Sequence, residues 1–257
     1  MTREIVLSQE ERDAKAQTVM VTGVTGFIGS RLVQRLLLGG HTVHGTCRNP
    51  DDTDRLHDLL QLEGAETRLK LFKADLLDAN GFDEAIKSCS TVFHVASPYI
   101  NGVKAKDAER KLFKPALMGT ENVLNAVNRC GSVKRVIVTS SCVAIYGKIT
   151  DDSKVGFIRS SPIADFSLFP NIGILKVYTE DDWNDDCSDD YLPYFASKVM
   201  AERKAWEMCN AQSRWTMVTM NPPAVLGTLH LTITITTYDR QYHRAFKISR
   251  HVNIASI

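Results

Sequence analysis

The stretch TVMVTGVTGFIG occupies residues 18–29, and its pattern of apolar residues changes partway along. Residues 18–22 form a short β-branched and apolar run that ends at a glycine, which is typical of a buried strand. From Ile28 onward, apolar residues recur at the spacing of a helix face, and Gly39 and Gly40 end that helix. We therefore expect a strand and a helix joined by a glycine-containing loop.

Strand-like and helix-like segments alternate along the rest of the chain. Further strands are expected at residues 42–46, 69–74, 91–96, 134–139 and 215–220, and helices at 51–62, 82–87, 105–130 and 191–212. Pro115 is expected to kink the third of these helices or to mark a first turn. Such an order implies right-handed βαβ units. The predicted fold class is α/β, a doubly wound parallel sheet (Rossmann-like) with helices on both faces.

Composition excludes several classes of protein. The 257 residues carry 31 basic and 30 acidic side chains, so the net charge of +1 argues against nucleic-acid binding by bulk electrostatics. We expect no membrane segment and no secretory signal peptide, because no apolar run has the required length. The six cysteines are scattered, and the acidic run at 181–190 lacks the spacing of a calcium loop. A cytoplasmic protein without a metal site is expected.

The three glycines of the first loop have separate physical roles. Gly23 permits a tight turn, Gly26 lets the backbone approach a pyrophosphate, and Gly29 lets the helix pack on the strand. The N–H groups at the start of the helix then face the anion. The residues predicted to bind a dinucleotide here are Gly23, Thr25, Gly26, Phe27, Ile28 and Gly29.

The end of the second strand indicates which dinucleotide binds. An NAD site usually places a carboxylate there to accept from the ribose 2′-hydroxyl. This chain has Arg48 instead, and no acidic residue before Asp51. Because a guanidinium forms charge-assisted hydrogen bonds with a phosphate, we expect NADP rather than NAD.

Tyr194 and Lys198 are four residues apart on a predicted helix and therefore share one face. A tyrosine hydroxyl has a reference pKa of about 10, and a nearby ammonium lowers that pKa. Tyr194 can then act as a general acid toward a carbonyl oxygen or as a base toward an alcohol. The spacing is common by chance, so its weight comes from the glycine loop in the same chain.

With the strand end Thr139-Ser140-Ser141, these motifs resemble the extended short-chain dehydrogenase/reductase family. The similarity is to its branch of dihydroflavonol reductases, cinnamoyl-CoA reductases and 3β-hydroxysteroid dehydrogenases. It runs from residue 18 to residue 227, apart from residues 155–176. The resemblance implies that Ser141, rather than Ser140, hydrogen-bonds the substrate oxygen, which completes a catalytic set with Tyr194 and Lys198.

The resemblance also implies further cofactor contacts. Asp75 and Leu76 correspond to the pair at the adenine, and the strand end with Ala96 and Ser97 runs beside the cofactor ribose. Lys198 would also hold the nicotinamide ribose. The segment from Asn221, with Pro222 and Val225, would meet the carboxamide end of the nicotinamide.

The predicted function is NADP-dependent interconversion of a carbonyl and an alcohol on a small hydrophobic substrate. Two alternatives remain open. One is an NAD-dependent sugar epimerase or dehydratase, which uses the same triad. The other is a dinucleotide-binding module with impaired catalysis. Residues 18–227 are expected to form one NAD(P)-binding domain, followed by an atypical tail at 228–257, and the sequence leaves the oligomeric state open.

Residues 155–176 depart from the family pattern. The segment is rich in Phe, Ile and Leu but has no clean period. One hypothesis is translated intron sequence, since it begins with Val and ends with Lys, whose codons can supply the usual intron ends. The other is a genuine insertion, for example a substrate flap. The resemblance further implies a C-terminal substrate lid, which is expected to be largely missing after Gly227.

Overall fold

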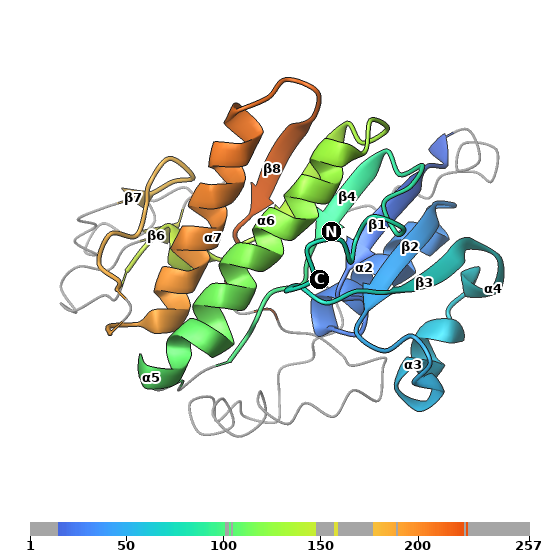
Figure 1. Ribbon diagram of the computed structural model, residues 1–257, viewed down its shortest axis with the longest axis horizontal. Helices are drawn as coiled ribbons and strands as arrows, with labels where there is room; N and C mark the ends of the chain where they lie inside the picture. Colours follow the sequence, from blue (N-terminus) through green and yellow to red (C-terminus); the bar gives the residue numbers. More distant parts are fainter. Residues whose placement is uncertain are drawn as a thin grey trace, which may run out of the picture.

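A computed structural model describes residues 15–100, 103, 105–147, 157–158, 177–188, 190–223 and 225. Its main sheet has six parallel strands in the order β3-β2-β1-β4-β5-β8 (Figure 1). They are β1 (Thr18–Thr22), β2 (Thr42–Cys47), β3 (Leu69–Lys73), β4 (Thr91–His94), β5 (Arg135–Thr139) and β8 (Thr216–Met220). The strand order reverses between β1 and β4, as in a doubly wound sheet, so the predicted fold class is confirmed.

The helices cover both faces of this sheet. They are α2 (Phe27–Leu38), α3 (Thr53–Leu60), α4 (Ala65–Arg68), α5 (Ala105–Ala108), η1 (Glu109–Phe113), α6 (Lys114–Arg129), η2 (Cys142–Ala144) and α7 (Pro193–Asn210). Figure 1 shows α6 and α7 side by side on one face, and the two helices are in contact. A short parallel pair, β6 (Phe157–Ile158) and β7 (Val177–Tyr178), forms a second sheet.

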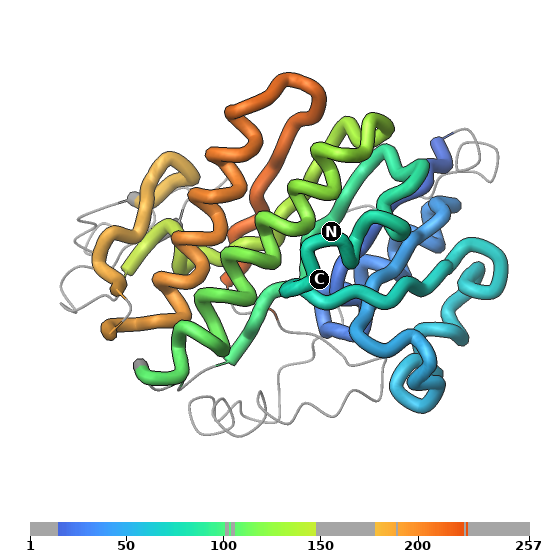
Figure 2. The backbone as a smooth tube through the Cα atoms, viewed as in Figure 1, coloured from blue at the N-terminus to red at the C-terminus, as the bar shows by residue number. Residues whose placement is uncertain are grey.

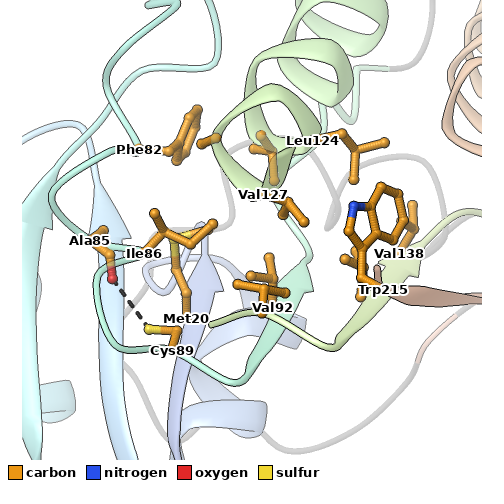
Figure 3. Close-up of a cluster of buried hydrophobic side chains, with 14 of the residues drawn as sticks. Met20, Phe82, Ala85, Ile86, Cys89, Val92, Leu124, Val127, Val138 and Trp215 are labelled. Atoms are coloured by element: carbon orange, nitrogen blue, oxygen red, sulfur yellow. Dashed lines mark hydrogen bonds between the residues drawn. The ribbon is translucent and has the colours of Figure 1, made fainter. Parts of the chain in front are cut away.

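The alternation of side chains along β1 divides the core into two layers. Val19 and Val21 are buried in a cluster with α2 and α3, whereas Met20 is buried in a cluster with α6 and β8. Figure 3 shows part of the second cluster, in which Met20 lies near Val92, and Leu124 of α6 lies farther from Met20. Because successive strand residues point to opposite faces, the three central residues of β1 must all be apolar to serve both layers.

Three of the expected elements differ in the structure. Residues 82–87 form hydrogen-bonded turns instead of the predicted helix. Most of the backbone hydrogen bonds here run from an N–H group to the carbonyl three residues earlier, as from Lys87 N to Glu84 O at 3.4 Å. Only one of the bonds in this segment has the spacing of an α-helix, from Ile86 N to Phe82 O at 3.1 Å. Ser88, with φ of 64°, closes the segment. The predicted helix at 191–212 begins only at Pro193, since Leu192 has a left-handed φ of 56°.

The predicted helix at 105–130 is divided into α5, the π-helical turn η1 and α6, and Figure 2 shows the chain running through them as one rod. Pro115 lies in the first turn of α6. A proline has no N–H to donate and crowds the carbonyl four residues earlier, which here belongs to η1. The wider π-turn relieves that crowding. The tail at 228–257 and most of residues 155–176 lie outside the described residues.

Replacing Phe82 by Ala tests the packing of the turn segment. The Phe82 side chain is 2% exposed and belongs to the cluster in Figure 3. We expect Phe82→Ala to lower the free energy of unfolding by about 3–5 kcal/mol in urea titrations. Leu77→Ala is the control, because Leu77 is exposed and should change stability by at most about 0.5 kcal/mol. Equal effects of the two substitutions would contradict the packing of this segment.

Candidate functional site

The glycine loop folds tightly between β1 and α2. Gly23 has φ of 70°, and its N–H donates to the Thr46 carbonyl at 3.0 Å. A Cβ at Gly23 would lie 3.0 Å from the Cβ of Ala96, and one at Gly29 would collide with the Gly23 carbonyl oxygen. The loop therefore closes against the end of β4, and α2 packs closely on the loop, as the sequence predicts for Gly23 and Gly29.

The start of α2 suits an anion. Its N-cap residue is Gly26, which offers no side-chain cap, and the first turn carries no acidic residue. The N–H groups of a first helical turn have no partner within the helix, and the helix dipole makes this end positive. With the backbone of Gly23 and Gly26 accessible to a ligand, the residues present fit the pyrophosphate of a dinucleotide.

A buried hydrogen-bond chain connects the glycine loop to α6. Thr22 Oγ1 accepts from the N–H groups of Val95 (3.0 Å) and Ala96 (2.9 Å) and is 3.1 Å from His94 Nδ1. Since Thr22 Oγ1 already accepts twice, its proton is donated to Nδ1. His94 Nε2 therefore carries the ring proton, and it faces Thr120 Oγ1 at 3.4 Å. Burial lowers the pKa of His94 to about 4, with the Lys198 charge adding to the effect.

Lys198 is buried where α7 passes the end of β4. Lys198 as a whole is 7% exposed, and its ammonium donates to Ser97 Oγ at 3.0 Å. The same Nζ lies 5.7 Å from the ring centroid of Tyr194, one helical turn earlier. Burial lowers the pKa of Lys198 to about 8, and the Glu202 carboxylate opposes that shift. The Tyr194 ring packs edge-on against Tyr99, with centroids 5.5 Å apart.

Ser141 follows β5 and serves as the N-cap of η2. Its Oγ accepts from Val143 N at 3.4 Å, and its side chain is buried. The preceding Ser140 lines the small cavity that Lys198 also lines, whereas Ser141 is not among the lining residues. The Ser140 hydroxyl is buried and has no hydrogen-bond partner among the described residues. The structure thus brings Tyr194, Lys198 and Ser97 together and places Ser141 at the adjoining strand end.

The predicted contacts of the adenine half follow β2 and β3, whereas the predicted nicotinamide contact Pro222 follows β8 at the opposite edge of the sheet. Arg48 is exposed just after β2. Asp75 is exposed, and its Oδ1 accepts from Leu77 N at 2.9 Å, a local turn contact. Leu76 is half-buried and packs against Gly119 of α6. The Pro222 carbonyl accepts from Cys142 N at 3.1 Å.

Two further polar residues lie beside this site: Glu202, to which the sequence analysis assigned no role, and Asn221, which it placed only in the segment beside the nicotinamide. Glu202 is 6% exposed, and its Oε2 accepts from Asn221 Nδ2 at 2.8 Å. Asn221 Nδ2 also donates to the Ser141 carbonyl at 3.2 Å. A glutamate four residues after Lys198 shares its helix face, so the spacing was the available signal for Glu202.

The fold and the glycine loop agree with a comparison to known families. The chain belongs to the NAD dependent epimerase/dehydratase family, whose model matches residues 19–170. This confirms the resemblance to extended short-chain dehydrogenases/reductases, and the similar curated proteins are reductases of the expected branch.

Two such relatives are plant enzymes. The chain is 39% identical over 211 residues to cinnamoyl-CoA reductase CAD2 of Medicago truncatula, covering 82% of this chain and 58% of that protein. It is 35% identical over 214 residues to the bifunctional dihydroflavonol 4-reductase/flavanone 4-reductase of Malus domestica, covering 83% and 56%. The chain therefore spans a little under three-fifths of the length of these relatives.

Solved reductase structures share the fold. Gre2 of Candida albicans in complex with NADPH matches with a TM-score of 0.65 and 29% identity, over 82% of this chain and 59% of that one. Vestitone reductase of alfalfa (Medicago sativa) matches with a TM-score of 0.57 and 28% identity, over 79% and 56%.

In the described part of this chain, no helix has both the length and the apolar character needed to cross a membrane. The same residues include no group of three or more potential metal ligands.

The buried His94 makes stability depend on pH. Its pKa is about 4 when folded and about 6.5 when unfolded, so the unfolded chain binds more protons between these values. Stability from this group is therefore complete above pH 6.5 and falls as pH drops toward 4, by on the order of 3 kcal/mol. Urea titrations from pH 4 to 8 should show a smaller decline in His94→Gln. The control, His57→Gln at an exposed position, should keep the decline of the native protein; an unchanged decline in His94→Gln would contradict this assignment.

Proposed function

We propose that this protein is an NADP-dependent oxidoreductase that interconverts a carbonyl and an alcohol on a small hydrophobic substrate. The observation that carries the proposal is the buried Lys198 ammonium, which lies 5.7 Å from the Tyr194 ring centroid and bonds Ser97 at the end of β4. In doubly wound sheets, dinucleotides bind at the carboxyl ends of the strands, beside the point where the strand order reverses. Lys198 and Tyr194 lie at that edge.

The cofactor contacts follow from the same edge. We propose one dinucleotide-binding domain over residues 18–227, with the segment 155–176 as an insertion and 228–257 as a tail. The glycine loop, with Thr25, Phe27 and Ile28, would hold the pyrophosphate. The remaining proposed contacts are Arg48 at the 2′-phosphate, Asp75 and Leu76 at the adenine, Ala96, Ser97 and Lys198 at the nicotinamide ribose, and Pro222 and Val225 at the nicotinamide. When bound, NADPH supplies the hydride.

The protein's own residues handle the proton and the substrate oxygen. In the direction of reduction, the Tyr194 hydroxyl donates its proton to the carbonyl oxygen, and in oxidation the phenolate takes a proton from the alcohol. The Lys198 ammonium stabilises the phenolate by charge. Ser141 would donate a hydrogen bond to the same oxygen. Its Oγ accepts from Val143 N, which leaves its hydroxyl proton available for donation.

A dinucleotide-binding module with impaired catalysis is the second candidate. Ser141 is not among the residues that line the cavity with Lys198, which supports this alternative. A sugar epimerase or dehydratase that retains NAD would use the same three catalytic residues. Several similar curated proteins are named reductases, which supports the first proposal over this one.

Replacing the proposed acid tests the reaction. Tyr194→Phe should lower NADPH-dependent reduction of small hydrophobic aldehydes and ketones by about 10²- to 10⁴-fold, because it removes the transferred proton. Thermal stabilisation by NADPH should persist, since the ring remains in place. Tyr191→Phe, at an exposed position, is the matched control and should retain activity. Native protein that binds NADPH but reduces no carbonyl in the panel would instead establish the binding module.

Replacing Arg48 tests the choice of cofactor. A charge-assisted hydrogen bond is worth about 1.5–3 kcal/mol, so Arg48→Ala should weaken NADPH binding by roughly 10- to 100-fold. NADH binding should change little, because NADH has no 2′-phosphate. Calorimetric Kd values for both nucleotides provide the measurement, with Lys87→Ala, at an exposed position, as the control. The assignment fails if both nucleotides lose the same affinity.

A further inference from the structure

Glu202 occupies a buried position that the proposed reaction does not use. It lies on α7 one turn after Lys198, and only 6% of it is exposed. Both residues line the same small cavity, together with Ser140 from the end of β5 and His94 from β4. A buried carboxylate is costly unless charge and hydrogen bonds compensate it, so its surroundings indicate what it does.

The hydrogen bonds of Glu202 lead to the strand end that carries Ser141. Its Oε2 accepts from Asn221 Nδ2 at 2.8 Å, and its Oε1 is 3.4 Å from Trp206 Nε1. The same Asn221 amide nitrogen donates to the Ser141 carbonyl at 3.2 Å. Glu202 therefore orients the Asn221 carboxamide, which connects α7 to Ser141, the N-cap residue of η2.

Two backbone bonds continue this connection on either side of Ser141. Ser140 N donates to the Met220 carbonyl at 2.8 Å, and Cys142 N donates to the Pro222 carbonyl at 3.1 Å. The chain after β5 is thus attached to the chain after β8 at three successive residues. Of these attachments, the side-chain bridge through Asn221 alone includes a residue of α7, so Glu202 links the helix to Ser141.

The charge of Glu202 acts on Lys198. Burial lowers the pKa of Lys198 to about 8, and the Glu202 carboxylate acts in the opposite direction. The other titratable group lining the cavity is His94, whose pKa of about 4 makes it neutral at neutral pH. Ser140 and Thr120 contribute only hydroxyl groups to this lining. Among the residues that line the cavity, Glu202 therefore supplies the negative charge that keeps the ammonium protonated.

We propose that Glu202 is a positioning residue for the Ser141-Tyr194-Lys198 site, holding Lys198 through its charge and Ser141 through the Asn221 carboxamide. This inference rests on the proposed oxidoreductase function. The competing interpretation is a structural role, in which Glu202 merely fills space between α7 and β8. The two differ in whether the negative charge matters, because glutamine has nearly the same shape as glutamate and retains an oxygen that can accept from Asn221.

Titrating Lys198 in Glu202→Gln tests the inference without requiring turnover. The ¹⁵N signal of Lys198 Nζ would be followed against pH in lysine-labelled protein and assigned with Lys198→Arg. We expect its deprotonation midpoint to move to lower pH than in the native protein, since the removed carboxylate favours the ammonium. Glu207→Gln is the matched control, because Glu207 lies on the same helix but is exposed and pairs with Lys204; it should leave the midpoint unchanged.

Kinetics provide the second readout. In Glu202→Gln, kcat for NADPH-dependent carbonyl reduction at pH 7 should fall roughly 10- to 100-fold, while KM for NADPH changes less. Glu202→Asp, which keeps the charge, should recover part of the loss and serves as the substitute if the glutamine variant does not fold. Asn221→Ser should lower kcat but leave the Lys198 midpoint in place, since it interrupts only the connection to Ser141.

The outcomes separate the two proposals. A Lys198 midpoint that is unchanged in folded Glu202→Gln overturns the positioning role. A midpoint that moves, in a native protein that reduces no carbonyl, leaves the electrostatic effect of Glu202 on Lys198 intact and overturns the proposed oxidoreductase function. A moved midpoint with reduced kcat supports both.

Discussion

A cation buried between a helix and the end of a parallel sheet is the constraint on which the rest of this site depends. Removing an ammonium from water costs several kcal/mol unless neighbouring groups compensate it. For Lys198 those groups are the hydroxyl of Ser97, the ring of Tyr194 and the charge of Glu202. Ser97 follows β4, and Tyr194 and Glu202 lie one turn of α7 before and after Lys198. The helix and the sheet must therefore meet in one register for the burial of Lys198 to be compensated.

Hydrogen bonds through His94 also hold the end of β4 in place relative to the glycine loop and α6. Thr22, at the start of the glycine loop, and Thr120, in the middle of α6, contact opposite nitrogens of the same ring. The loop, the end of β4 and α6 therefore cannot move independently. Since α6 packs against α7, the glycine loop and the Lys198 cavity belong to one connected unit. A neutral imidazole suits this place, because a second cation beside Lys198 would be repelled.

The sequence predicted the sheet well because strands such as β1 and β5 have an apolar, β-branched centre. It failed at residues 82–87, where a helix was expected but the chain forms successive turns that bury Phe82 and Ile86. The conformation there is decided by Ser88 and by packing against α6, which are features of the assembled fold. Likewise, the Tyr194–Lys198 spacing identified two neighbours on one helix, whereas the contacts of Ser97 and Asn221 join residues far apart in the chain.

Glu202 illustrates why a site is harder to predict than a fold. A glutamate four residues after a lysine is a common arrangement on exposed helices, where it adds only a few tenths of a kcal/mol. The same spacing acquires another meaning once α7 is buried against the ends of β5 and β8, because charges interact more strongly away from water. The burial of Glu202 depends on how α7 packs on the sheet, and the residues that determine this packing take no part in the proposed chemistry. The motif therefore indicates the proposed proton-transfer residues, but their electrostatic environment becomes visible only when the strand ends are assembled around the helix.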